Sequence, residues 1–178
     1  MRDEDFTRRA ASLEWLLFDV DGVLTDGLIY YSARGETLKR FNAKDGLAFR
    51  LAQRGGLRIG LLTGRSSKPL ERRARDLDFD ATIYGSKNKL EDFQRFLKQH
   101  KTQPARVAYI GDDLPDLPVL GRCGLAFAPN DAVAEVRATA HRVLEAGGGR
   151  GAAREMIESL LRARGQWDEI ISTFAREG

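Results

Sequence analysis

The sequence has only one cysteine, Cys123, among its 178 residues, so an intramolecular disulfide is excluded. The lack of disulfides is typical of proteins that work in a reducing cytosol. No apolar run approaches the length of a membrane span, and the charged segment 1–9 has no apolar core of a signal peptide. These features predict a soluble, cytoplasmic protein that does not bind a membrane.

A strong net charge is also lacking, since 29 Lys and Arg residues stand against 26 Asp and Glu residues, a formal charge of +3. Nucleic-acid binding requires basic residues gathered on one face with aromatic residues between them. The basic run at Arg72, Arg73 and Arg75 is too short to indicate such a face. We therefore expect no nucleic-acid partner, whereas a few well-placed cations would suit a small anionic substrate.

Apolar runs alternate with helical patterns along the chain, which has the size of one domain, residues 1–178. The runs that predict strands are 16–20, 59–62, 81–84 and 107–110, with weaker ones at 124–127 and 141–144. The segments that predict helices are 46–54, 67–77, 88–100, 114–120, 132–140 and 151–164. Continuous apolar runs are typical of strands covered on both faces, so we expect an α/β fold with a mainly parallel sheet flanked by helices.

Two segments depart from this alternation. Residues 28–31 and 37–41 are β-prone and flank a short loop that contains Gly35, which predicts a small β-hairpin over about 27–41. Near the end of the chain, the glycines between Gly147 and Gly151 predict a flexible break before the last helix. We expect the C-terminal segment of about 147–178 to be flexible, especially beyond Gly165.

Polar groups stand at the ends of three predicted strands: Asp19 with Asp21, Thr63, and Asp112 with Asp113. Parallel sheets bind ligands outside the carboxyl ends of their strands, so we expect these groups to meet. Any one acidic pair could simply cap a helix or form a turn. Several carboxylates gathered in one place resist ionisation unless a cation is present, and Mg²⁺ prefers such oxygen ligands.

The spacing of these residues suggests a phosphoryl-transfer site. The Asp19 carboxylate could attack phosphorus and form an aspartyl phosphate, while Asp21 could protonate the leaving alkoxide and later accept a proton from water. The Thr63 hydroxyl and nearby backbone N–H groups could hold the phosphoryl oxygens, and Lys89 could neutralise their charge. The sequence thus predicts a Mg²⁺-dependent phosphatase.

Four segments in order resemble the motifs of the haloacid dehalogenase superfamily of phosphatases. They are Asp19-Val20-Asp21-Gly22-Val23-Leu24-Thr25, Leu62-Thr63-Gly64-Arg65, Lys89, and Gly111-Asp112-Asp113-Leu114-Pro115-Asp116. The resemblance implies a Rossmann-like core with Asp19 as nucleophile and Mg²⁺ ligand. It implies that Asp21 is the acid/base and binds Mg²⁺ through its main-chain carbonyl, and that Asp112 is the remaining ligand. Asp113 and Asp116 would support the ligands or stabilise the turn.

Three further segments resemble one subgroup of this family, which hydrolyses a phosphorylated eight-carbon sugar acid in lipopolysaccharide biosynthesis. They are Thr25-Asp26-Gly27 with the hairpin and the following residues 41–46, then residues 85–90, and residues 148–155. The resemblance implies a small hairpin flap instead of a cap domain, and homotetramers whose hairpins pack together and whose subunits help to close one another's sites.

The same resemblance implies a set of substrate contacts. Besides Asp21, Thr63 and Lys89, the implied substrate-binding residues are Asn42, Ala43, Lys44, Asp45, Gly46, Arg50, Gly64, Arg65, Arg73 and Arg150. Arginine suits both the carboxylate and the phosphate of a phosphorylated sugar acid through its bidentate fork. Without the resemblance, Arg50 and Arg73 could equally belong to a solvated helix face.

Two alternatives stay open at this point. Ala43 and Lys44 stand where the subgroup has Val-Arg, and Leu47 stands where it has an aromatic residue. A phosphatase for a nine-carbon keto-deoxy sugar acid 9-phosphate is therefore the first alternative. A non-catalytic binding protein on the same fold is the second, because the fold alone does not fix a function.

Overall fold

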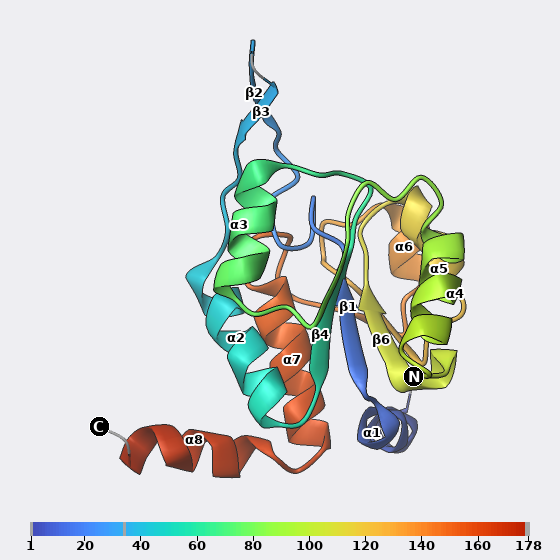
Figure 1. The fold of residues 1–178 in the computed structure, drawn as a ribbon. Helices are drawn as coiled ribbons and strands as arrows, with labels where there is room; N and C mark the ends of the chain where they lie inside the picture. The colour runs from blue at the N-terminus through green and yellow to red at the C-terminus, as the bar shows by residue number, and fades with distance from the viewer. Residues whose placement is uncertain (1, 34, 177–178) are drawn as a thin grey trace.

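The core of the protein is a six-stranded sheet in the order β5-β4-β1-β6-β7-β8, in which every neighbouring pair is parallel. The structure is a computed structural model that describes residues 2–33 and 35–176. The strands are β1 (Trp15–Phe18), β4 (Arg58–Leu62), β5 (Ala81–Ile83), β6 (Val107–Ile110), β7 (Leu125–Ala128) and β8 (Arg142–Val143). This arrangement confirms the predicted α/β fold with a mainly parallel sheet (Figure 1).

Helices cover both faces of the sheet, because alternate residues of its strands point into two separate apolar cores (Figure 1). On β1, Leu16 and Phe18 belong to one core, whereas Trp15 and Leu17 belong to the other. The helices of the first core are α1 (Asp3–Ser12), α2 (Ala43–Arg54), α3 (Lys68–Asp76), α7 (Ala152–Ala163) and α8 (Trp167–Arg176). Those of the second core are α4 (Lys89–Gln99), α5 (Leu117–Leu120) and α6 (Ala134–Thr139).

The predicted hairpin is present and projects from the body of the molecule (Figure 1). Its strands are β2 (Tyr30–Ser32) and β3 (Gly35–Leu38), which pair antiparallel. Arg34, in the loop predicted between the strands, lies outside the described residues, as do Met1, Glu177 and Gly178. The side chains of Tyr31 and Leu38 are exposed in this chain.

Capping residues explain where the observed elements differ from the predicted ones. Helix α2 begins at Ala43, three residues before the predicted start, because the Asn42 side chain accepts a hydrogen bond from the backbone N–H of Lys44. The predicted helix 114–120 is divided into the 3₁₀ helix η2 (Leu114–Asp116) and α5. A capping box between Asp113 and Asp116 starts η2. A further 3₁₀ helix, η1 (Pro104–Arg106), precedes β6.

The two ends of the described chain form helices that the sequence analysis did not predict. Helix α1 buries Phe6 and Ala10, and α8 (Trp167–Arg176) buries Trp167 and Ile170. Arg162 of α7 lies over the Trp167 ring, 4.9 Å from its centroid. The flexibility of residues 147–178 stays a prediction. That residues 1–178 form a single domain also stays a prediction. Among the described residues, no helix has both the length and the apolar character needed to span a membrane.

Candidate active site

A pocket of about 550 Å³ opens at the carboxyl edge of the sheet, where β1, β4 and β6 end. Asp19 directly follows β1, Thr63 directly follows β4, and Asp112 lies two residues beyond β6. The pocket brings together seven of the predicted site residues: Asp19, Asp21, Thr63, Gly64, Arg65, Lys89 and Asp112. The convergence follows from the parallel order of the strands, as the sequence analysis expected.

The Asp19 carboxylate is buried at the floor of this pocket. Its backbone N–H donates to the carbonyl of Ile110 at 3.0 Å, which extends the β1–β6 pairing by one residue. Its Oδ1 lies 3.0 Å from the Nζ of Lys89. Burial raises the pKa of Asp19 to about 6, although the charge of Lys89 acts in the opposite direction.

Lys89 reaches the pocket because α4 begins there. The Asn88 side chain caps this helix by accepting a hydrogen bond from the backbone N–H of Glu91. Lys89 is buried, and its Nζ also contacts Asp116 Oδ1 at 2.6 Å. Burial opposes its charge, but Asp19 and Asp116 outweigh that effect and raise the pKa of Lys89. The result is a fixed cation beside the predicted nucleophile.

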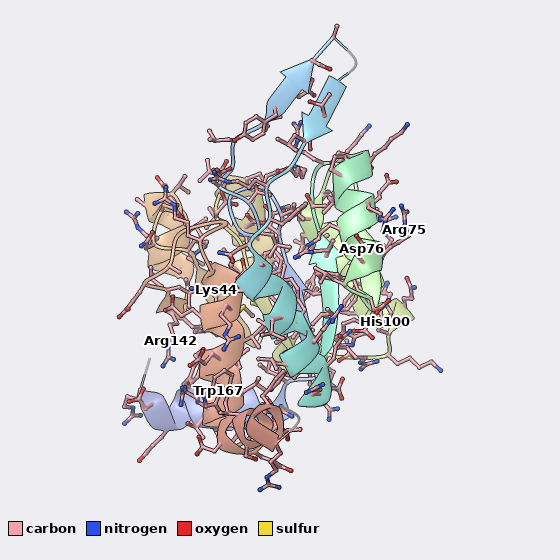
Figure 2. All side chains as sticks on the ribbon, turned by 90° about the vertical axis from the view of Figure 1, so that its left-hand side faces the viewer. Lys44, Arg75, Asp76, His100, Arg142 and Trp167 are labelled. Carbon is pink, nitrogen blue, oxygen red and sulfur yellow. The ribbon has the colours of Figure 1, made fainter. Side chains whose placement is uncertain are left out.

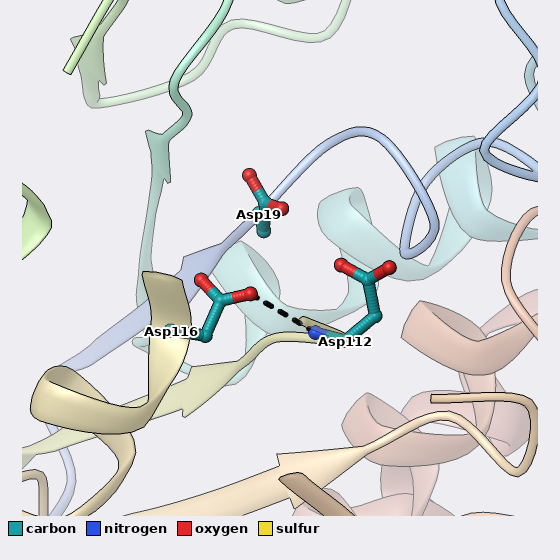
Figure 3. A group of neighbouring side chains, drawn as sticks. All are labelled: Asp19, Asp112 and Asp116. Atoms are coloured by element: carbon teal, nitrogen blue, oxygen red, sulfur yellow. Dashed lines mark hydrogen bonds between the residues drawn. The ribbon is translucent and has the colours of Figure 1, made fainter. Parts of the chain in front are cut away.

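Asp116 lines the pocket but is almost fully buried, and its carboxylate is held by neighbouring protein groups. Besides Lys89, its carboxylate accepts hydrogen bonds from the Tyr109 hydroxyl and from the backbone N–H groups of Asp112 and Asp113, at 3.1 and 3.2 Å. Figure 3 shows the one from Asp112. Sequence reasoning missed Tyr109, which is fully buried on β6 and looks like an ordinary core aromatic residue. The one feature of the sequence that could have indicated Tyr109 is its hydroxyl group, which lies near the end of the predicted strand and just before the acidic turn.

Three carboxylates form a group that can hold a metal ion. Ligand oxygens of Asp19, Asp112 and Asp116 lie within 4.8 Å of one another (Figure 3). Burial, reinforced by the charges of Asp19 and Asp116, raises the pKa of Asp112 to about 8. Carboxylates that repel one another in this way are suited to a hard divalent cation, so the residues fit Mg²⁺. Because protein groups already occupy the Asp116 oxygens, Asp19 and Asp112 are the better ligands.

Gly22 allows the loop after β1 to pass close to Asp112. Its φ is +81°, which favours glycine, and a Cβ at this position would lie 1.9 Å from Asp112 Oδ2. A side chain at this position would therefore displace a predicted metal ligand.

Asp21 does not belong to the three-carboxylate group. Its Oδ1 forms an ion pair with Lys39, and its Oδ2 lies 3.5 Å from Arg65 Nε. Both cations also contact Glu36 on β3, each at 3.0 Å. Sequence reasoning missed Lys39 and Glu36, because nothing in the order of residues shows that the base of the hairpin folds onto Asp21.

Thr63 and Gly64 shape the opposite wall of the pocket. Thr63 is buried, and its Oγ1 accepts a hydrogen bond from the backbone N–H of Arg65 at 3.3 Å. Its carbonyl accepts from the backbone N–H of Ser86 at 3.0 Å, which draws the loop before α4 toward the pocket. Ser86, Lys87 and Asn88 consequently line the pocket as well, and the sequence analysis had not selected them.

The other predicted substrate contacts lie away from this pocket in a single chain. Asn42, Asp45 and Arg73 border a small internal cavity beneath α2 and α3, and Gly46 packs against Arg73. Lys44 and Arg150 line a separate groove of about 430 Å³ along α7, and Figure 2 shows Lys44 on the outer face of that helical layer. Ala43 and Arg50 are exposed. The role of these residues in substrate binding therefore stays a prediction.

Comparison with known proteins assigns the family. Residues 40–124 match the family described as haloacid dehalogenase-like hydrolase. The chain is 42% identical over 161 residues to the 3-deoxy-D-manno-octulosonate 8-phosphate phosphatase KdsC of Yersinia pestis, covering 90% of this chain and 86% of that protein. This chain is a member of the haloacid dehalogenase-like hydrolase family. The corresponding Escherichia coli K12 phosphatase is 41% identical over 165 residues, 93% of this chain and 88% of that protein.

Solved structures of haloacid dehalogenase-like phosphatases have the same fold. The Y. pestis KdsC phosphatase structure aligns with a TM-score of 0.89 and 41% identity, over 93% of this chain and 89% of that one. A 3-deoxy-D-manno-octulosonate 8-phosphate phosphatase from Moraxella catarrhalis aligns with a TM-score of 0.93 and 33% identity, over 98% and 99%. That structure is a complex with a magnesium ion, a phosphate ion and a KDO molecule.

Proposed function

We propose that this protein hydrolyses 3-deoxy-D-manno-octulosonate 8-phosphate to the free sugar acid and phosphate, as a step of lipopolysaccharide biosynthesis. The observation that carries the proposal is the likeness to KdsC phosphatases, at 42% identity over 90% of the chain. The structure adds a polar pocket in which Asp19, Lys89 and Asp112 converge. A buried carboxylate with a raised pKa, fixed beside a buried ammonium group in such a pocket, is typical of a catalytic site.

In the proposed reaction, an Asp19 oxygen attacks phosphorus, and the bond between phosphorus and the sugar oxygen breaks. Asp21 donates a proton to the departing alkoxide, so that the sugar acid leaves as an alcohol. Water then attacks the phosphorus of the aspartyl phosphate, Asp21 accepts a proton from that water, and the bond between phosphorus and the Asp19 oxygen breaks, which releases inorganic phosphate. Asp19 is restored as a carboxylate for the next turnover.

Other groups of the pocket hold the phosphoryl group. The Lys89 ammonium group stabilises negative charge on its oxygens, and the Thr63 hydroxyl and nearby backbone N–H groups donate hydrogen bonds to them. Bound Mg²⁺ would supply further positive charge beside the phosphate. The Asp19 and Asp112 carboxylates and the main-chain carbonyl of Asp21 would hold it.

The substrate contacts imply more than one subunit. We propose that the protein is a homotetramer and that a neighbouring subunit brings part of the Asn42–Gly46 segment at the start of α2, together with Arg50, Arg73 or Arg150, toward the pocket. The support is that Arg65 lines the pocket of its own chain, whereas Lys44 and Arg150 line a groove elsewhere. A reducing cytoplasm suits a chain with one buried cysteine, and we propose that location.

Replacing Asp19 by Asn tests the covalent mechanism. An amide is a poor nucleophile, so we expect Asp19→Asn to lower kcat by at least about 10⁴-fold while the melting temperature stays close to that of the wild type. Acid quenching during turnover of ³²P-labelled substrate should trap label on the wild-type protein and none on the variant. Asp76→Asn, the same change on an exposed helix position, serves as the control. Turnover at the wild-type rate in Asp19→Asn would exclude the mechanism.

A further inference from the structure

We propose that Lys39 is a positioning residue: from the base of the hairpin it fixes the carboxylate of Asp21, through which it acts on the reaction. The inference rests on the proposed role of Asp21 as acid/base. In this proposal the hairpin positions a catalytic group of its own chain. This role does not depend on contacts between the hairpin and other subunits.

Burial distinguishes Lys39 from the rest of the hairpin. Lys39 is 7% exposed, whereas Tyr31 and Leu28 are 68% and 60% exposed. A lysine ammonium group is rarely buried unless anions compensate for the water that it loses. The hairpin therefore places a buried cation at its base, and the partners of that cation indicate its role.

Those partners form a closed set of alternating charges. Lys39 contacts Asp21 Oδ1 and Glu36 Oε1, and Arg65 approaches Asp21 Oδ2 and Glu36 Oε2. Each oxygen of Asp21 thus faces a different cation. The Lys39 contact is a hydrogen bond, whereas Asp21 Oδ2 and Arg65 Nε are 3.5 Å apart and have no hydrogen-bond partner. Lys39 is therefore the group that holds the Asp21 carboxylate in place.

The position of Lys39 argues against a direct role in binding phosphate. Among the described residues, Lys39 does not border the main pocket, whereas Asp21 and Arg65 do. Lys89 does border the pocket, and its ammonium group contacts Asp19 and Asp116 instead. The two buried lysines therefore contact different carboxylates. Lys89 contacts the proposed nucleophile Asp19, and Lys39 contacts the proposed acid/base Asp21.

Steady-state kinetics of Lys39 variants test the inference. We expect Lys39→Met to lower kcat on the order of 10- to 100-fold, because a misplaced catalytic group can cost about 10²-fold, with KM changed less than about threefold. Lys39→Arg keeps the charge and should recover most of the loss. Arg40→Met removes an adjacent, exposed hairpin cation that pairs with Asp26, and should leave kcat unchanged.

A double-mutant comparison separates positioning from a structural role. In an Asp21→Asn background, Lys39→Met should cause no further loss of kcat, since the group through which it acts is already disabled. Lys39→Met leaves Asp21 and Glu36 with only one of their two cations, Arg65, so a second variant guards against a loss of folding. Glu36→Gln/Lys39→Met removes one charge of each sign, and we expect the same loss of kcat from it.

The outcomes decide the inference independently of the substrate. Wild-type kcat in Lys39→Met, a change confined to KM, or an equal loss in the Asp21→Asn background would each overturn it. If the wild-type protein hydrolyses another alkyl phosphate ester, such as a hexose 6-phosphate, but not the sugar acid 8-phosphate, the proposed substrate fails. The Lys39 comparison is then made with that alkyl ester, whose leaving alkoxide also needs a proton, and is still decided by the same outcomes.

Discussion

At the scale of single residues, Asp45 is a buried carboxylate outside the pocket. It accepts a hydrogen bond from the backbone N–H of Arg154 at 2.8 Å and lies near the charges of Arg73 and Arg154. Burial outweighs these partners and raises its pKa to about 6. The protonated form is therefore favoured in the folded protein more than in the unfolded chain, whose aspartates have a pKa near 3.8.

The raised pKa of Asp45 makes the folded protein less stable at neutral pH than at acidic pH, because proton binding favours the folded state. The contribution of Asp45 to stability is fully present below about pH 4 and is lost as the pH rises through about 6. Asp45→Asn removes this titration. We expect the free energy of unfolding of the variant, relative to the wild type, to rise by on the order of 2–3 kcal/mol between pH 4 and 7. Urea denaturation at several pH values measures it, and a difference independent of pH would contradict the expectation.

The residues that sequence could select were those with a local signal. Asp19, Thr63 and Asp112 follow apolar runs, and the structure places them in one pocket. Lys39 and Tyr109 gave no such signal, because their partners are 18 and 7 residues away and are brought close only by the hairpin and by the turn after β6. A buried charge pair depends on tertiary packing, which residue order does not reveal.

At the scale of elements, the glycines before α7 allow their loop to pack closely against the loop that follows β1. A Cβ on Gly148 would lie 2.0 Å from the carbonyl oxygen of Gly22, and one on Gly149 would lie 2.6 Å from the carbonyl carbon of Thr25. The backbone N–H of Gly149 donates to the Val23 carbonyl at 2.9 Å. The loop that carries the candidate site thus rests on the segment that sequence analysis expected to be a flexible break.

Gly148→Ala tests this packing. The new methyl group would meet backbone atoms that cannot move aside alone, so we expect a loss of about 2–3 kcal/mol in the free energy of unfolding. Gly121→Ala is the matched control, because its Cβ would meet its nearest neighbour, the Leu117 carbonyl oxygen, at 3.4 Å. Equal stabilities of the two variants, measured by urea denaturation, would show that the loops have room to separate.

The sequence predicted the internal elements of the fold better than its ends. Strands β1, β4 and β6 have continuous apolar runs, which is the signal that buried parallel strands give. Helix α1 is rich in charge and buries only Phe6 and Ala10, so its apolar pattern is sparse. Helix α8 follows Gly165, whose φ of +68° ends the preceding turn, and the glycine was interpreted as the start of a mobile tail.

At the scale of the whole molecule, the hairpin carries an exposed apolar surface. Leu28, Ile29, Tyr31 and Leu38 are between 43% and 68% exposed in the single chain. An exposed group of this kind is typical of a surface that another protein covers. The proposed homotetramer would cover it with the hairpins of other subunits.

Substituting two of these residues tests the assembly. We expect the wild-type protein to sediment at about four times the 19.9 kDa mass of the chain. Tyr31→Asp/Leu38→Asp should reduce the mass to that of smaller species, because charges would be buried in the interface. Ile171→Asp, an exposed apolar position on α8, is the control. A wild-type protein that sediments as a monomer would contradict the proposed tetramer.

The most direct test of the central claim is phosphate release from 3-deoxy-D-manno-octulosonate 8-phosphate, measured with Mg²⁺ and with EDTA, beside a nine-carbon keto-deoxy sugar acid 9-phosphate. We predict release that requires Mg²⁺, is abolished by EDTA, returns when Mg²⁺ is restored, and has its highest kcat/KM with the eight-carbon substrate. A higher kcat/KM with the nine-carbon substrate would contradict the proposed substrate. No metal-dependent release from either would contradict the proposed function itself.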